Sequence, residues 1–226
     1  MPDERRQSAI SQIALIASNS IPLFGVIFLH WQVFPIILIY WLENVVVGGF
    51  NVLRMLVADP DNPAVWIGKL FLIPFFCFHF GMFTAVHGTF VFAIFDRGTI
   101  ATSHSMFPTF ATVSAAVRHF GIGFAVLALV VSHAASFVWN YILGGEYRRA
   151  SIAVLMSQPY SRVVVLHVAI LGGGILVQAL HSPVPALVVL IGAKVWIDLA
   201  AHRRERAKLA LPAMPGASAD PEVSQP

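Results

Sequence analysis

Hydrophobic residues fall into long blocks that are separated by short polar segments. Six such blocks can be read along the chain, at about 9–29, 32–57, 66–93, 119–143, 163–181 and 184–202. Each block is close to the length of about 20 residues that a helix needs to cross a hydrocarbon layer about 30 Å thick. The pattern therefore predicts six transmembrane helices.

Two of the connections between these blocks are very short. The sequence HWQ at 30–32 joins the first two blocks, and HSPVP at 181–185 joins the last two. Trp31 is suited to the headgroup level, and the prolines of the second connection are typical of a turn. We expect a tight hairpin at each place.

The composition agrees with a membrane protein. Of the 226 residues, 58% are hydrophobic and 11% are charged, whereas soluble domains carry about 25% charged residues. We therefore expect an all-α polytopic membrane protein with a single transmembrane helical domain over 1–205. The segment 206–226 is rich in Pro, Ala and Ser, and it is expected to form a disordered cytoplasmic tail.

The distribution of Lys and Arg predicts the orientation. With a cytoplasmic N-terminus, the outer side receives only Arg97 and Arg118. The inner side receives Arg5, Arg6, Arg54, Lys69, Arg148, Arg149, Arg162, Arg203, Arg204, Arg206 and Lys208. The positive-inside rule then places both termini in the cytoplasm. Basic residues spread along membrane borders suit anionic lipid headgroups and argue against nucleic-acid binding.

Ionisable side chains inside apolar spans are costly, and they therefore suggest function. Glu43, His79 and His133 each lie about ten residues or more from the ends of their blocks, which places them near the midplane at about 1.5 Å per residue. Carboxylate and imidazole groups suit Zn, Fe or Cu. If the three converge, they would form a metal site for a metal-dependent membrane enzyme, such as a lipid hydrolase.

A second polar group is expected closer to the cytoplasm. Its members are His167, Asn51, Arg54, Lys194, Asp198 and His202. Together with His87 and the midplane histidines they could form a proton relay, because imidazole titrates near pH 6.5. The alternative function is therefore a proton-coupled transporter, although no inverted repeat or broken helix pair is evident in the sequence.

Two further alternatives remain open. His79 and His133 could hold a non-covalent haem between two helices. The polar side chains could also serve only to join helices in a structural or accessory subunit.

Four stretches carry a resemblance to a known family. They are YWLENVVVGGFNVLRM at 40–55, FHFGMFTAVHG at 78–88, SQPYSRVVVLHVAILGGG at 157–174 and KVWIDLAAH at 194–202. Over roughly residues 10–205 the chain resembles an uncharacterised bacterial integral-membrane family, the domain of unknown function 6498. The signature positions are Trp41, Glu43, Asn51, Arg54, His79, His87, Asp198 and His202. The resemblance implies a membrane class and no particular activity.

Overall fold

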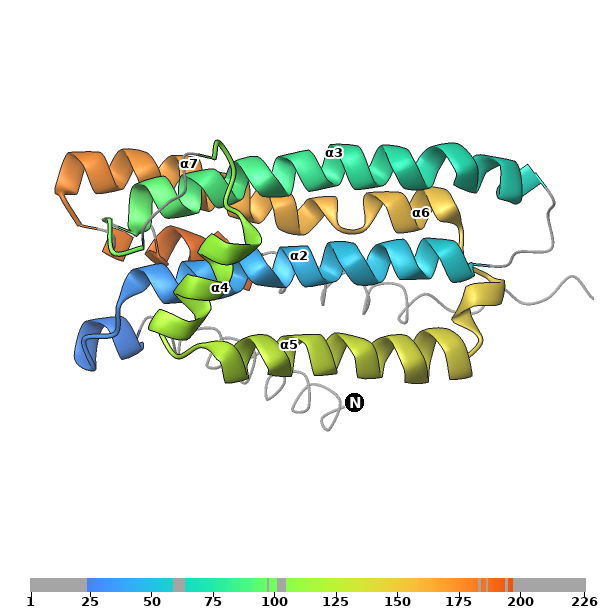
Figure 1. Ribbon diagram of the computed structural model, residues 1–226, viewed down its shortest axis with the longest axis horizontal. Helices are drawn as coiled ribbons and strands as arrows, with labels where there is room; N and C mark the ends of the chain where they lie inside the picture. The colour runs from blue at the N-terminus through green and yellow to red at the C-terminus, as the bar shows by residue number, and fades with distance from the viewer. Residues whose placement is uncertain are drawn as a thin grey trace, which may run out of the picture.

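The computed structural model describes residues 24–58, 64–96, 98–100, 105–182, 184–185, 187–193 and 195–196. Within these residues all regular structure is helical. The elements are α2 (Val33–Val57), α3 (Ala64–Phe95), α4 (Phe110–His119), α5 (Gly123–Ser136), the π-helix η1 (Phe137–Leu143), the 3₁₀-helix η2 (Glu146–Arg148), α6 (Ile152–Ser157) and α7 (Tyr160–Leu180). The long helices run side by side, and α2 lies between α3 and α5 (Figure 1).

Three helices are long and apolar enough to cross a membrane. They comprise residues Val33–Val57, Trp66–Phe95 and Gly123–Leu143. These helices confirm three of the six predicted blocks, and their ends differ from the predicted ends by only a few residues. The finding indicates a membrane protein.

The other three blocks are described only in part. Most of block 9–29 lies outside the described residues, although 24–28 are helical. The fifth block contains a shorter apolar helical stretch, Leu166–Val177. In the sixth block the described residues up to 196 are helical, while the rest of it and the tail at 206–226 lie outside the described residues.

Helices α2 and α3 pack closely because glycines face aromatic rings. The indole Nε1 of Trp41 donates to the Thr84 carbonyl at 2.8 Å. A Cβ at Gly88 would lie 2.6 Å from Cζ2 of Trp41, and a Cβ at Gly48 would collide with the Phe80 ring. Small residues of this kind allow close helix contact in membranes, where lipid provides no hydrophobic driving force between helices.

The C-terminal end of α2 is capped by side chains from other elements. The Nζ of Lys69 donates to the Leu56 carbonyl at 3.0 Å and also to the Ala58 carbonyl. The hydroxyl of Tyr141 donates to the Arg54 carbonyl at 2.8 Å. Carbonyls at a helix end lack intrahelical donors, and Lys69 supplies one to Leu56 and Ala58. The Arg54 carbonyl already accepts from the Ala58 N–H at 2.9 Å, so Tyr141 is its second donor. These contacts fix η1 and the start of α3 beside α2.

The helix in the fifth predicted block begins a few residues before 163, and a turn separates it from the short helix that precedes it. Helix α6 ends at Ser157, Gln158 and Pro159 form a turn, and α7 begins at Tyr160. Proline has no N–H, so Pro159 leaves the carbonyl four residues earlier, that of Leu155, without its helical partner. The amide Nδ2 of Asn51 on α2 donates to this carbonyl at 2.9 Å.

The short helix α4 lies between the third and fourth predicted blocks. The side chain of Thr109 caps it by accepting from the Thr112 N–H at 3.2 Å. Val113 and Val117 pack against the buried core, whereas Phe110 is exposed. Helix α4 therefore presents one apolar face to the bundle and another to its surroundings.

Candidate functional site

The two histidines of α3 contact two residues of α7 at matching intervals. The Nδ1 of His79 lies 2.7 Å from the Tyr160 hydroxyl. Eight residues later, the Nε2 of His87 lies 2.9 Å from the Nδ1 of His167. Both spacings are about two helical turns. Because the lower-numbered residues pair with each other and so do the higher-numbered ones, α3 and α7 run parallel at this contact.

The hydrogen bonds fix the protonation pattern of the neutral histidine pair. The Nδ1 of His87 lies 2.7 Å from the Phe83 carbonyl, which can only accept, so Nδ1 carries the hydrogen. The Nε2 of a neutral His87 is then an acceptor, and the Nδ1–H of His167 donates to it. In this pattern the Nε2 of His167 carries a lone pair, and no hydrogen bond to it occurs among the described residues.

The surroundings of the two α3 histidines differ. His79 stacks on Phe75 with ring centroids 5.3 Å apart, and it also contacts the Phe83 ring. His87 is only 3% exposed, whereas its partner His167 lies on the exposed side of α7. His167 is therefore the more exposed ring of the pair among the described residues.

A separate polar cavity lies on the other side of α2. It has a volume of about 260 Å³. It is lined by Val47, Phe50, Asn51, Arg54, His133, Ser136, Gln158 and Pro159. The Nδ1–H of His133 donates to the Leu129 carbonyl at 2.9 Å, and the ring stacks on Phe50. The turn between α6 and α7 thus closes a cavity whose other walls are α2 and α5.

Arg54 brings a positive charge to this cavity. Its guanidinium lies over the Tyr141 ring, with 5.6 Å from Cζ to the ring centroid. Its Nε is buried and has no hydrogen-bond partner in the described part of the chain. No carboxylate lines the cavity among the described residues. The site is therefore cationic and incompletely satisfied.

The structure does not bring the three predicted metal ligands together. Among the described residues, no three His, Cys, Asp or Glu side chains form a group that could hold a metal ion. His79 faces α7 and His133 lines the cavity between α2 and α5, and α2 lies between α3 and α5 (Figure 1). Glu43 lies half-buried on α2. The same separation of His79 from His133 gives no geometric support to a haem held between them.

The second predicted polar group is divided into two parts. His87 and His167 form the hydrogen-bonded pair. Asn51 and Arg54 instead line the cavity with His133. Lys194, Asp198 and His202 lie outside the described residues, so their part in a relay stays a prediction.

Tyr160 and Gln158 are site residues that the sequence reasoning missed. A signal was present, because Tyr160 and His167 are seven residues apart while His79 and His87 are eight apart. Two helices that carry polar groups about two turns apart can pair them in parallel. That comparison would have identified α7 as the partner of α3.

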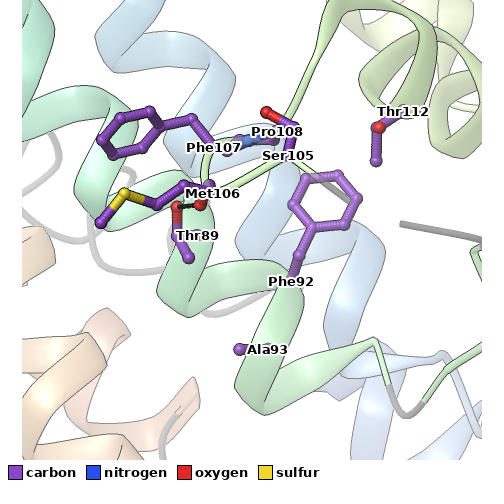
Figure 2. Close-up of a pocket in the computed structure, with 8 residues that line it drawn as sticks. All are labelled: Thr89, Phe92, Ala93, Ser105, Met106, Phe107, Pro108 and Thr112. Atoms are coloured by element: carbon purple, nitrogen blue, oxygen red, sulfur yellow. Dashed lines mark hydrogen bonds between the residues drawn. The ribbon is translucent and has the colours of Figure 1, made fainter. Parts of the chain in front are cut away.

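A further cavity, of about 190 Å³, has little polar chemistry. The segment 105–108 crosses over α3 there, and the hydroxyl of Thr89 donates to the Met106 carbonyl at 3.0 Å (Figure 2). Phe92, Phe107 and Pro108 supply much of the wall. No ionisable side chain lines it among the described residues. It is therefore a weaker candidate than the His87–His167 pair or the Arg54 cavity.

Comparison with known proteins places the chain in a family without giving an activity. Neither the curated proteins nor the solved structures contain a match. A family model covers residues 1–214, which is nearly the entire chain. The protein therefore belongs to the family of unknown function DUF6498.

Proposed function

We propose that this protein is a proton-coupled transporter of a bacterial inner membrane, and that the His87–His167 pair is its proton-binding site. The observation that carries the proposal is the 2.9 Å contact between the two imidazoles. It joins a 30-residue apolar helix to α7. Ionisable groups inside such helices are rare, and in transporters they mark proton pathways.

The pair can take up and release one proton without changing its partners. A proton binds the free Nε2 of His167 and forms an imidazolium. Its Nδ1–H bond can then break as that proton moves to the Nε2 of His87, which transfers the positive charge to the buried ring. The Nδ1–H of His87 remains donated to the Phe83 carbonyl, which is not a base, so the proton returns through His167.

Two irregular elements of the bundle support transport. The turn at Gln158 and Pro159 interrupts the helical path between α6 and α7, and η1 is a π-helix at the end of α5. Interrupted helices at substrate and ion sites are typical of transporters, and π-helical turns are frequent at functional sites. One interrupted helical path is therefore present, although no inverted repeat is evident in the sequence.

The proposed topology has six spans with both termini cytoplasmic. Lys69 at the start of α3 caps the end of α2 that carries Arg54, and Tyr141 of η1 contacts the same end. Arg148 and Arg149 follow shortly after η1. Arg118 lies on α4, toward the other end of the bundle (Figure 1). This clustering at one end supports a cytoplasmic assignment for it and contact there with anionic headgroups.

Proteoliposomes containing a pH-sensitive dye test the proposal. Proton movement is measured under a pH gradient with inorganic phosphate or sulfate on one side, because the neighbouring cavity is cationic. We expect the protein to move protons faster than protein-free liposomes. His87→Gln and His167→Gln should each lower the rate to that of empty liposomes, since neither variant can hold the excess proton on both rings.

His119→Gln is the matched control, because His119 lies exposed on α4. It should leave the rate unchanged. A protein whose rate equals that of empty liposomes, or a His87→Gln variant that retains the full rate, would contradict the proposal. Elemental analysis of the same samples addresses the metal-dependent enzyme. Stoichiometric zinc, iron or copper that is lost in His79→Ala and His133→Ala would favour that function instead.

A further inference from the structure

Arg54 brings a guanidinium to the cavity, and no carboxylate lines that cavity among the described residues. No ion pair to Arg54 occurs in the part of the chain that the structure describes, and its Nε is buried without a partner. The polar residues that also line the cavity are Asn51 of α2, His133 and Ser136 of α5, and Gln158 of the turn before α7. A partly buried guanidinium without a counter-ion is unfavourable, so this site is suited to an anion from outside the chain.

The end of a helix adds to the positive potential. Pro159 is the N-cap residue of the 21-residue helix α7, and it lines the cavity. The side chain of Pro159 itself makes no capping hydrogen bond. The partial positive charge at a helix N-terminus favours anions. Arg54 and the start of α7 therefore act on the same space.

The hydrogen-bonding groups also specify the type of anion. A guanidinium presents parallel N–H donors that match the oxygens of a carboxylate or phosphate. Ser136 can donate its hydroxyl hydrogen, and the His133 Nε2, opposite the bonded Nδ1, can accept from an O–H group or donate when protonated. The volume of about 260 Å³ has room for a small anion with water, which occupies roughly 30 Å³ per molecule in the liquid.

From this arrangement we infer that the cavity binds an oxyanion, either the phosphate or carboxylate group of a small solute or the phosphate of a lipid headgroup. Arg54 neutralises its charge, and Ser136 and His133 contact its other oxygens. The inference goes beyond the proposed proton movement, because binding here does not require the His87–His167 pair.

Calorimetric titration of the full-length protein in detergent with inorganic phosphate tests the free anion. Arg54→Gln should weaken phosphate binding by about tenfold or more, since a hydrogen bond to a charged group contributes about 1.5–3 kcal/mol. Arg118→Gln, an exposed arginine on α4, should leave binding unchanged. His133→Gln retains Arg54 and alters a different helix, so it provides a second variant if Arg54→Gln does not fold. It should weaken binding by a smaller factor.

Native mass spectrometry tests the lipid source. The protein is reconstituted with an equal mixture of phosphatidylglycerol and phosphatidylcholine before it is extracted. The lipid source is supported if the unaltered protein and Arg118→Gln retain phosphatidylglycerol and Arg54→Gln does not. This holds even if free phosphate does not bind. The inference is overturned if neither phosphate nor phosphatidylglycerol binds. It is also overturned if Arg54→Gln and His133→Gln both bind these ligands as tightly as the unaltered protein does.

The two proposals fail independently. His87→Gln should retain phosphate binding even though it stops proton movement. Arg54→Gln can lose the anion whether or not the histidine pair holds a proton.

Discussion

The Nε2 of His87 on α3 lies 2.9 Å from the Nδ1 of His167 on α7. The same two helices meet two turns away, where His79 contacts the Tyr160 hydroxyl at 2.7 Å. The two contacts fix both the direction and the register of α7 against α3. A shift of one residue in either helix would turn these polar groups by about 100° and would leave them among apolar side chains or lipid.

The first prediction concerns the contact between His79 and Tyr160. Tyr160→Phe removes the hydroxyl and should lower the free energy of unfolding by about 1 kcal/mol, the usual net value of a hydrogen bond. Thermal unfolding in detergent measures the loss. Tyr147→Phe is the control, because the Tyr147 hydroxyl bonds an exposed arginine, Arg148. Equal melting temperatures for the two variants would contradict the importance of the His79 contact.

Asn51 stabilises the interruption between α6 and α7. Asn51→Leu leaves the Leu155 carbonyl without the amide that replaces the missing Pro159 N–H, and a buried unpaired polar group costs about 1–3 kcal/mol. We expect destabilisation of that size in chemical or thermal unfolding. Asn140→Leu removes an exposed amide that bonds Ser136, and it should have little effect. If both variants unfold alike, Asn51 does not support the break.

Gly48 and Gly49 provide a comparison within one helix. A Cβ at Gly48 would collide with the Phe80 ring, whereas a Cβ at Gly49 would meet nothing within 4 Å. Gly48→Ala should therefore destabilise the protein by about 1–3 kcal/mol. Gly49→Ala should be neutral or stabilising, because alanine favours helix by up to about 1 kcal/mol. Unfolding curves that place the two variants in the opposite order would show that α2 and α3 pack differently.

Membrane orientation can be tested with single cysteines. Cys77→Ser first removes the natural thiol, which is exposed on α3. Arg118→Cys should then react with a membrane-impermeant maleimide added outside whole cells, and Arg148→Cys should react only after the cells are opened. The reverse pattern would show that the topology is inverted. Labelling of both cysteines from the same side would show that the membrane is not crossed once between residues 118 and 148.

Hydropathy alone predicted the class of fold, because three apolar blocks were long enough to specify their helices to within a few residues. Helical geometry also placed His79 and His87 on one broad face, and both do face α7. The missing information was which helices pack together. Depth along the membrane normal can be counted from the sequence, but a residue's partner across the bundle depends on helix order.

Glu43, His79 and His133 illustrate this limit. Their similar depths suggested convergence, yet α2 lies between the helices that carry the two histidines (Figure 1). Arg54 and Asn51 were expected with His167 and lie instead beside His133. The break at Pro159 was hidden for a different reason. The polar SQPYSR stretch resembles a loop between spans, and only the Asn51 contact shows how its free carbonyl is satisfied within the bundle.

The shared hydrogen bond itself offers the most direct test. Protein labelled with ¹⁵N in histidine is reconstituted in lipid, and nuclear magnetic resonance detects the scalar coupling between nitrogens joined by a hydrogen bond. We predict a coupling between the Nε2 of His87 and the Nδ1 of His167 that disappears in His167→Gln, with the Nδ1 of His87 protonated throughout. Two uncoupled rings, with His87 protonated on Nε2 in the neutral state, would contradict the proposed proton-binding pair.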